Sequence, residues 1–208
     1  MSAPGWPVSL VSGRVGLRPL RLRDSATWVE LRVRNQEWLA RWEGRRPELP
    51  PVTWEERHSA GSFTAMLRAL RQESRLGSTL PFGVTYDGVL VGQLTVSNVT
   101  RGAAQMASIG YWIDESHAGQ GIIPVALAMA VDHCLTAVRL HRVEINIRPD
   151  NAASLRVVEK LGFRDEGLRR KLLFIDGQWC DHRCFALTVE DRPDGVLSAL
   201  MATVRDDL

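Results

Sequence analysis

The stretch ASIGYWIDESHAGQGIIP, residues 107–124, decides the fold of this chain. Its first eight residues are rich in apolar and aromatic side chains and predict a strand. The GQG that follows lets the backbone turn sharply, and the apolar run after it predicts a helix that ends near Val138. Amide groups at such a turn and helix N-terminus suit an anion, so this loop is a candidate pyrophosphate site. We expect one apolar stripe along the helix, made of Leu127, Ala130, Val131, Cys134 and Val138.

A second segment, PDNAASL at residues 149–155, repeats this arrangement. It follows an alternating strand predicted at 142–147 and opens a helix, with Asn151 placed to cap that helix and Ser154 on its first turn. Each glycine or cap pattern alone fits an ordinary turn. The first is not a Walker loop, since no Gly-Lys-Ser/Thr follows, and its GxGxxG pattern is incomplete. The two strand-to-helix turns therefore gain force only together.

The rest of the chain adds strands and helices around these two turns. Asp24 predicts the start of a helix that runs to about Arg34, and helical character continues to Trp42. Thr53 and Glu56 form a capping-box pattern before a helix that ends near Gly77. The predicted strands lie at 15–22, 82–86, 90–96, 107–114, 142–147, 172–175 and 179–188, and a C-terminal helix follows from 194. This order predicts a mixed α/β sheet with helices packed on it.

Composition limits the classes of function. The 208 residues, 45% hydrophobic and 24% charged, suit one globular domain. A net charge of +2 argues against direct, sequence-independent binding of nucleic acid. Three cysteines are too few for a disulfide framework and fit a reducing cytosol, and Cys180-Asp-His182-Arg-Cys184 lacks a second ligand cluster, so no metal is expected. Without a signal peptide or a long apolar run, we expect a soluble, cytoplasmic protein that does not contact membranes.

Several ordered motifs resemble the central run of the GNAT acetyltransferases. They are IGYWI at 109–113, GQG at 119–121, HRV at 141–143, NAAS at 151–154 and EKLGFRDEG at 159–167. The segments VSNVTRG at 96–102 and FIDGQWCDH at 174–182 resemble the RimJ/RimL branch, which acetylates the N-terminal amine of ribosomal proteins. Asn35, Leu39 and the Trp42-Glu43 pair also match that branch. The resemblance covers nearly the whole chain after its first few residues.

The resemblance implies an α/β acyl-CoA N-acyltransferase fold. Its twisted, mostly antiparallel sheet is flanked by helices, and a V-shaped splay separates the strand at 110–113 from the strand at 143–147. A single domain would span 1–208, with a core at about 14–190 and a helical tail at about 194–208. Acetyl-CoA would be the cosubstrate, its pantetheine arm in the splay and its pyrophosphate on the glycine loop. The implied cosubstrate-binding residues are Tyr111, Trp112, Ile113, Gly119, Gln120, Gly121, Ile122, Ile123, Asn151 and Ser154.

The resemblance also assigns catalytic roles. Ser154 matches the serine that protonates the leaving thiolate, whereas Val158 stands where many superfamily members have a tyrosine acid. At the two positions where family members carry a glutamate base, this chain has Ser108 and Leu173. The loop before the glycines also departs from the family pattern, at Ser116 and His117. No general base is therefore assigned, although Glu166, Asp176, Asp181 and His182 are candidates to relay a proton. An α-amine, with a pKa near about 7.7–8.0 against about 10.4 for lysine, needs a base least, which favours a protein N-terminus as acceptor.

The acceptor is expected between the first two helices and the last hairpin. Trp38, Trp42, Glu43 and Trp179 are its candidate contacts, although the tryptophans fit core packing or a homodimer face equally well. A small amine as acceptor, a larger acyl donor, or a non-catalytic acyl-CoA-binding or ribosome-assembly module remain the alternatives. The sequence favours direct attack by the amine on the thioester, with the nascent oxyanion held near Trp112 and Ile113.

Overall fold

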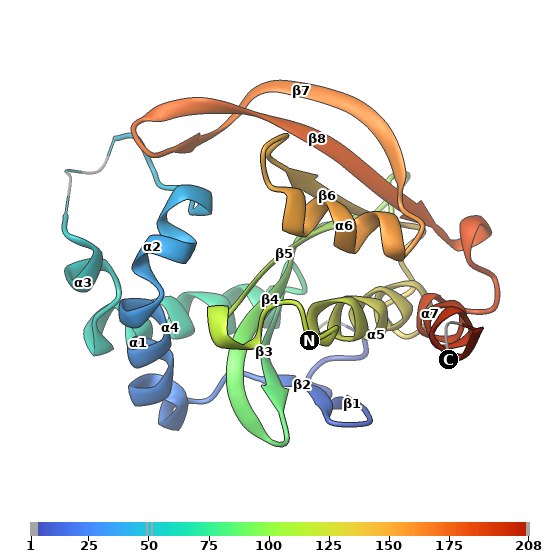
Figure 1. Cartoon of the computed structure of the whole chain (residues 1–208), viewed down its shortest axis with the longest axis horizontal. Helices are drawn as coiled ribbons and strands as arrows, with labels where there is room; N and C mark the ends of the chain where they lie inside the picture. The colour runs from blue at the N-terminus through green and yellow to red at the C-terminus, as the bar shows by residue number, and fades with distance from the viewer. Residues whose placement is uncertain (1–3, 49, 51, 207–208) are drawn as a thin grey trace.

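The computed structural model of the protein describes residues 4–48, 50 and 52–206. Its centre is one sheet with the strand order β1-β2-β3-β4-β5-β6-β8-β7. Neighbouring strands are antiparallel except β5 and β6, which are parallel (Figure 1). The strands are β1 (Leu10–Ser12), β2 (Val15–Pro19), β3 (Leu80–Tyr86), β4 (Val89–Thr100), β5 (Met106–Ile113), β6 (Arg142–Ile147), β7 (Arg164–Ile175) and β8 (Gln178–Thr188).

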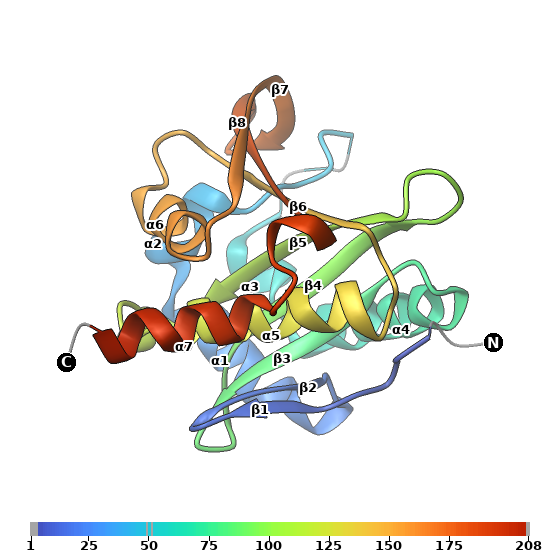
Figure 2. The same cartoon turned by 90° about the vertical axis from the view of Figure 1, so that its right-hand side faces the viewer.

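Helices cover both faces of the sheet. Figure 2 shows α5 and α7 side by side across the face turned to the viewer. Two neighbouring residues of β4 point to opposite faces of the sheet and contact different helices. Leu90 packs with the cluster of α1 and α4, whereas Val91 packs with the cluster of α5. The helices are α1 (Ser25–Arg34), α2 (Gln36–Leu39), α3 (Trp54–Arg57), α4 (Ala60–Leu76), α5 (Ile122–Thr136), α6 (Ala152–Lys160) and α7 (Val196–Asp206).

The structure confirms several of the helix caps and helix ends that were predicted from neighbouring residues. Thr53 and Glu56 form the expected capping box, Gly77 ends α4 in the left-handed conformation, and Asn151 caps α6. The helix after Thr53 is nevertheless interrupted, because Ser59 caps a new helix through a hydrogen bond from the amide of Ser62 (3.2 Å). The expected single helix is therefore two, α3 and α4.

Other expectations also need correction. Asp24 precedes α1 but does not cap it, since its carboxylate accepts the amide of Arg21 (2.7 Å) and pairs with Arg18 (2.8 Å). Helix α5 is buried nearly all round rather than along one stripe, because it lies between the sheet and α7. Strand β7 begins at Arg164, well before the predicted start, and β1 was not predicted at all.

The predicted splay is present between β5 and β6. These strands pair at three positions, Met106–Arg142, Ala107–Val143 and Ser108–Glu144, and the described ladder then ends. Beyond it β5 stays paired with β4 as far as Ile113, and β6 stays paired with β8 as far as Ile147. Each strand thus keeps one partner and turns its other edge to the gap, which confirms the V-shaped splay.

Candidate active site

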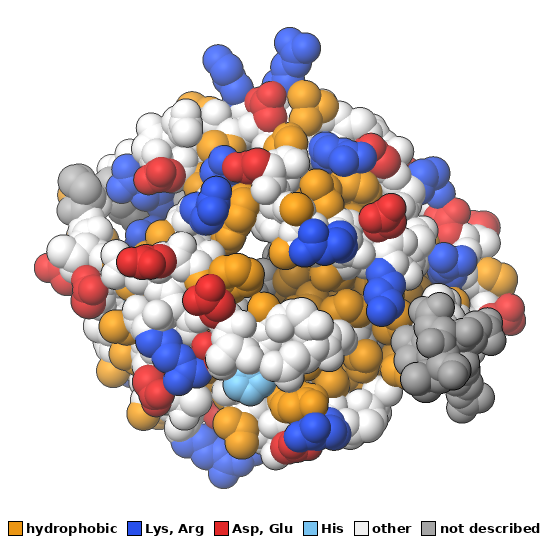
Figure 3. Space-filling view, in the orientation of Figure 1, with side chains coloured by type: hydrophobic (Ala, Val, Ile, Leu, Met, Phe, Trp, Pro, Cys, Tyr) orange, Lys and Arg blue, Asp and Glu red, His pale blue; other side chains and the backbone are white. Residues whose placement is uncertain are grey.

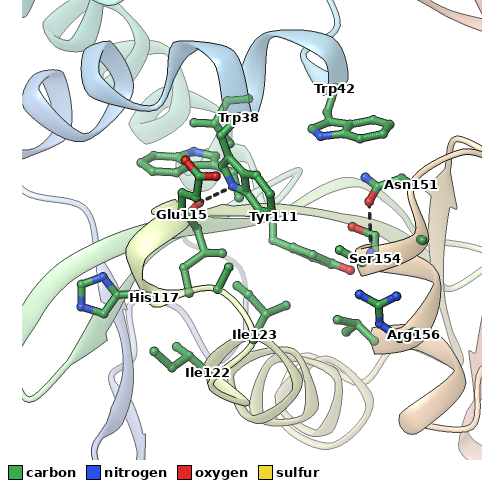
Figure 4. A pocket seen from close by; sticks show the side chains of 18 of the residues that line it. Trp38, Trp42, Tyr111, Glu115, His117, Ile122, Ile123, Asn151, Ser154 and Arg156 are labelled. Carbon is green, nitrogen blue, oxygen red and sulfur yellow. Dashed lines mark hydrogen bonds between the residues drawn. The ribbon is translucent and has the colours of Figure 1, made fainter.

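A cavity of about 600 Å³ opens at this splay, between β5, α2 and the starts of α5 and α6 (Figure 4). In the space-filling view, the hollow has an apolar interior with basic side chains near its edge (Figure 3). The structure brings most of the predicted site residues into its wall. They are Trp38, Trp42, Tyr111, Trp112, Ile113, Gly119, Gly121, Ile122, Ile123, Asn151 and Ser154.

The loop before α5 presents free backbone donors to the cavity. Gly119 and Gly121 have φ of +74° and +76°, a conformation that disfavours any side chain, although a Cβ at either would meet nothing within 4 Å. Within the described residues, no acceptor is paired with the amides of residues 119–123. Five adjacent donors at a helix N-terminus form a site for an anion.

A buried carboxylate fixes the base of this loop. Asp114 is 1% exposed, and its two oxygens accept hydrogen bonds from Arg34 (2.8 Å), Asn35 (2.7 Å), Ser116 (2.5 Å) and His117 (2.8 Å). Burial alone would raise the pKa of Asp114, but these bonds outweigh it and hold the pKa below its usual range. The end of α1 is thereby tied to the start of the loop. The sequence pattern did not reveal this role for Asp114.

Asn35 completes the link between α1 and the loop. Its side-chain nitrogen donates to Asp114, while its side-chain oxygen accepts the amide of Glu115 (2.9 Å). The residue is only 3% exposed, so these bonds are made away from water. The loop that carries the free amides is therefore held in place before any ligand arrives.

Ser154 lies on the opposite wall, on the first turn of α6. Its amide donates to the side chain of Asn151 (3.1 Å), the cap bond that sets where α6 begins. Its hydroxyl faces Tyr111, whose ring extends from β5 across the floor of the cavity (Figure 4). Burial raises the pKa of Tyr111 to about 12, and the neighbouring Ser154 hydroxyl opposes this rise.

Trp38 of α2 and Trp42 of the 3-10 turn that follows (Ala40–Trp42) form the upper wall (Figure 4). The indole nitrogen of Trp38 donates to the carbonyl of Ile113 (3.1 Å), which ties α2 to the end of β5. The ring of Trp42 lies beneath the guanidinium groups of Arg41 (4.7 Å) and Arg148 (5.4 Å). Both side chains thus belong to the cavity wall rather than to the core.

Three predicted residues lie elsewhere. The Gln120 side chain folds back onto the carbonyl of Ser116 (2.9 Å). Glu43 is part of an ionic cluster with Arg32, Arg57 and His58, and Trp179 is 53% exposed on β8 beside a separate hollow of about 260 Å³. The contacts predicted for Glu43 and Trp179 with an acceptor stay predictions.

The candidate proton relays are also outside the cavity wall. Glu166 pairs with Arg142 and Arg164, and the hydrogen bond from Arg142 is the main reason that its pKa falls to about 2. His182 is 3% exposed and its ring contacts the carbonyl of Cys180 (3.1 Å), while Asp176 and Asp181 lie on or beside the β7–β8 turn. None of these four side chains lines the cavity.

One group of side chains has the donor atoms of a metal site. Ligand atoms of Glu144, Glu166 and Cys184 lie within 4.8 Å of one another. Arg142 and Arg169 already pair with Glu144, so the buried negative charge has partners. The absence of a metal stays an expectation.

Residues 14–164 match the family described as "Acetyltransferase (GNAT) domain". The chain belongs to the GNAT acetyltransferase family, and the protein is an acyltransferase enzyme. A "Ribosomal protein uS5-alanine N-acetyltransferase" of Escherichia coli (strain K12) is 30% identical over 190 residues, which cover 90% of this chain and 94% of the relative. "Probable N-acetyltransferase YjcK" of Bacillus subtilis (strain 168) is 29% identical over 177 residues, 84% of this chain and 94% of the relative.

Solved structures show the same GNAT fold. The structure of "Mycobacterium smegmatis RimJ in complex with CoA-disulfide" is 44% identical, covers 97% of each chain and superposes with a TM-score of 0.92. A Vibrio fischeri ribosomal-protein-S5-alanine acetyltransferase is 27% identical over 88% of this chain and 98% of its own, with a TM-score of 0.78. Among the described residues, no helix combines the length and apolarity that crossing a membrane requires.

Proposed function

We propose that this GNAT enzyme transfers an acetyl group from acetyl-CoA to the N-terminal α-amine of a protein, with a ribosomal protein as the natural acceptor. The observation that carries the proposal is that five free backbone amides and an open sheet edge line the same cavity. The names of the relatives support the acceptor, since one acts on the alanine of ribosomal protein uS5 and another is a RimJ bound to a CoA disulfide.

The residues of the cavity fit acetyl-CoA. The amides of residues 119–123 would hold its pyrophosphate, with Arg156 and Lys160 on the wall of α6 adding positive charge. The open edge of β5 at residues 111–113 would pair with the amides of the pantetheine arm, while Asn151 stands beside that path. Acetyl-CoA supplies the reactive thioester, and the protein supplies its position.

The chemistry requires positioning more than a strong base. Part of any α-amine population is neutral near pH 7, since the group has a pKa of about 7.7–8.0. Its nitrogen attacks the thioester carbonyl carbon, and a backbone amide in the Trp112–Ile113 region stabilises the oxyanion that forms. Ser154 lies on the wall where the leaving sulfur can take up a proton. Trp38 and Trp42 border the side from which the acceptor would enter.

CoA release in the presence of acetyl-CoA tests the acceptor class. Peptides that begin with Ala, Ser or Thr should be acetylated, whereas spermidine and free lysine should not. Turnover on the small amines alone would contradict the proposal, and binding of acetyl-CoA with no turnover on any acceptor would favour a non-catalytic acyl-CoA-binding module.

Ser154→Ala tests the proton donor. We expect kcat to fall with the KM for acetyl-CoA little changed, because the hydroxyl acts after the cosubstrate is bound. Ser198→Ala, an exposed serine on α7, is the matched control and should keep the wild-type kcat. A Ser154→Ala enzyme with unchanged kcat would remove Ser154 from the mechanism.

A further inference from the structure

The phenol of Tyr111 is an unpaired, buried polar group on a residue that lines the cavity. Its hydroxyl oxygen is fully buried and, in the described part of the chain, has no hydrogen-bond partner. Nearly all buried polar groups in folded proteins are paired, so an exception calls for an explanation. Trp38, elsewhere in the same cavity, shows the ordinary case, since its part-buried indole nitrogen donates to the carbonyl of Ile113.

The position of this hydroxyl points to the reaction. Tyr111 extends from the free edge of the sheet, and in Figure 4 its hydroxyl is directed at Ser154, while α5 lies below it. Both residues line the cavity that would take the thioester. The orphan phenol and the serine therefore stand together where a negative charge develops on sulfur.

We propose that Tyr111 is the proton donor to the leaving thiolate, either directly or through the hydroxyl of Ser154. This inference rests on the acetyl-transfer function proposed above. The amine nitrogen forms the new bond to the acyl carbon as the carbon–sulfur bond breaks, and the electron pair of that bond goes to sulfur. Sulfur takes the proton from the tyrosine oxygen, and the resulting phenolate regains a proton lost by the acylated nitrogen, through water.

The acidity of the two hydroxyls favours this assignment. A phenol is a stronger acid than the alkyl alcohol of serine, so Tyr111 is the better proton source of the pair. Burial raises the pKa of Tyr111 to about 12, which keeps the donor protonated at every pH where the enzyme would work. Ser154 acting as a bridge passes one proton on while it accepts another, and no charge is left on its oxygen.

The test replaces only the hydroxyl. Tyr111→Phe should lower kcat at least tenfold, within the range of general acid catalysis, and leave the KM for acetyl-CoA within about twofold. The chain has only two tyrosines, so Tyr86→Phe is a matched control, and Tyr86 is not part of the cavity wall. It should retain the kcat of the wild type. An unchanged kcat in Tyr111→Phe would overturn the proposal.

Two readouts separate this role from a structural one. The ligand-free Tyr111→Phe protein should melt close to the wild type, because the hydroxyl makes no short protein hydrogen bond and has only the Ser154 hydroxyl beside it. The thiol of bound CoA should titrate about one pH unit higher in Tyr111→Phe, since the thiolate loses a hydrogen bond from the phenol. A lower melting temperature would show that Tyr111 acts by holding the fold, and an unchanged thiol pKa would show that its phenol does not reach the sulfur.

The thiolate titration follows ultraviolet absorbance and needs no acceptor. It therefore remains decisive even when no peptide proves to be a substrate. If the wild type does not turn over any peptide, the proposed acceptor is rejected. If the pKa of the CoA thiol is unchanged in Tyr111→Phe, the role of Tyr111 as proton donor is rejected. The two failures are thus distinguishable.

Discussion

Asp114→Asn provides a stringent test of how the glycine loop is held. The substitution keeps the shape of the side chain but removes its charge and turns one acceptor oxygen into a donor. The carboxylate now accepts five hydrogen bonds, two of them from the guanidinium of Arg34 and one from Asn35. Ser116 and His117 can reverse their roles, because each can accept as well as donate, but Arg34 cannot.

The expected loss in stability follows from these contacts. Hydrogen bonds to charged groups contribute about 1.5–3 kcal/mol each, and removing one partner of a buried ion pair costs about 3–5 kcal/mol. The Arg34 side chain is 48% exposed, so water takes over part of the lost pairing, and the upper figure does not apply in full. We expect the free energy of unfolding to fall by about 2–4 kcal/mol.

Urea denaturation of the ligand-free protein measures this loss, and CoA binding reports on the loop. Asp87→Asn is the matched control, because Asp87 also pairs with an arginine but on the exposed surface. It should change stability far less, as exposed pairs do. If both variants lose the same stability, Asp114 does not anchor the loop. If Asp114→Asn is less stable yet binds CoA with wild-type affinity, the anchor does not serve the anion site.

Three further predictions concern separate parts of the fold. Gly121→Ala should weaken CoA binding measured by calorimetry, whereas Gly88→Ala, with a similar positive φ in a surface turn, should lose about 1 kcal/mol of stability but keep its affinity. Glu43→Gln should lower the free energy of unfolding, measured in urea, by about 3 kcal/mol, because Arg32, only 5% exposed, loses its counter-charge. A higher KM for the acceptor with unchanged stability would instead support a contact between Glu43 and the acceptor. The pKa of Glu166 is about 2 in the folded protein, below its value of about 4.3 in the unfolded chain. The stability that the Glu166 carboxylate contributes is therefore complete above about pH 4.3 and is lost as the pH falls toward 2. The stability of Glu166→Gln, measured over the same acid range, should lack this pH-dependent loss.

The features that sequence predicted well are local ones. Thr53 and Asn151 cap helices through bonds to residues three positions away, and Gly77 ends a helix by its own conformation. Such signals depend on a few neighbouring residues and survive without tertiary information. The resemblance to GNAT enzymes then supplied the splay, which no local pattern reveals.

The features that sequence missed depend on distant parts of the chain. Asp114 becomes an anchor only because α1 brings Arg34 and Asn35 to it, 80 and 79 residues away. Tyr111 was expected only to bind the cosubstrate, and its phenol gains a further role only beside Ser154, which lies on α6. Asp24 was expected to cap a helix, but a nearby arginine competes for its carboxylate. Pairing across the fold decides the first two cases, whereas a local ion pair decides the third.

The gap in the sheet also bears on inhibition. An exposed strand edge normally invites other chains to pair with it, and proteins protect such edges. Here two edges face inward, so the backbone groups are sheltered from large partners but open to a slender, extended molecule. A short peptide-like compound whose amide spacing mimics a β-strand should compete for this gap without resembling a nucleotide. Selectivity would then come from the side chains that border the gap, above all Trp38 and Trp42.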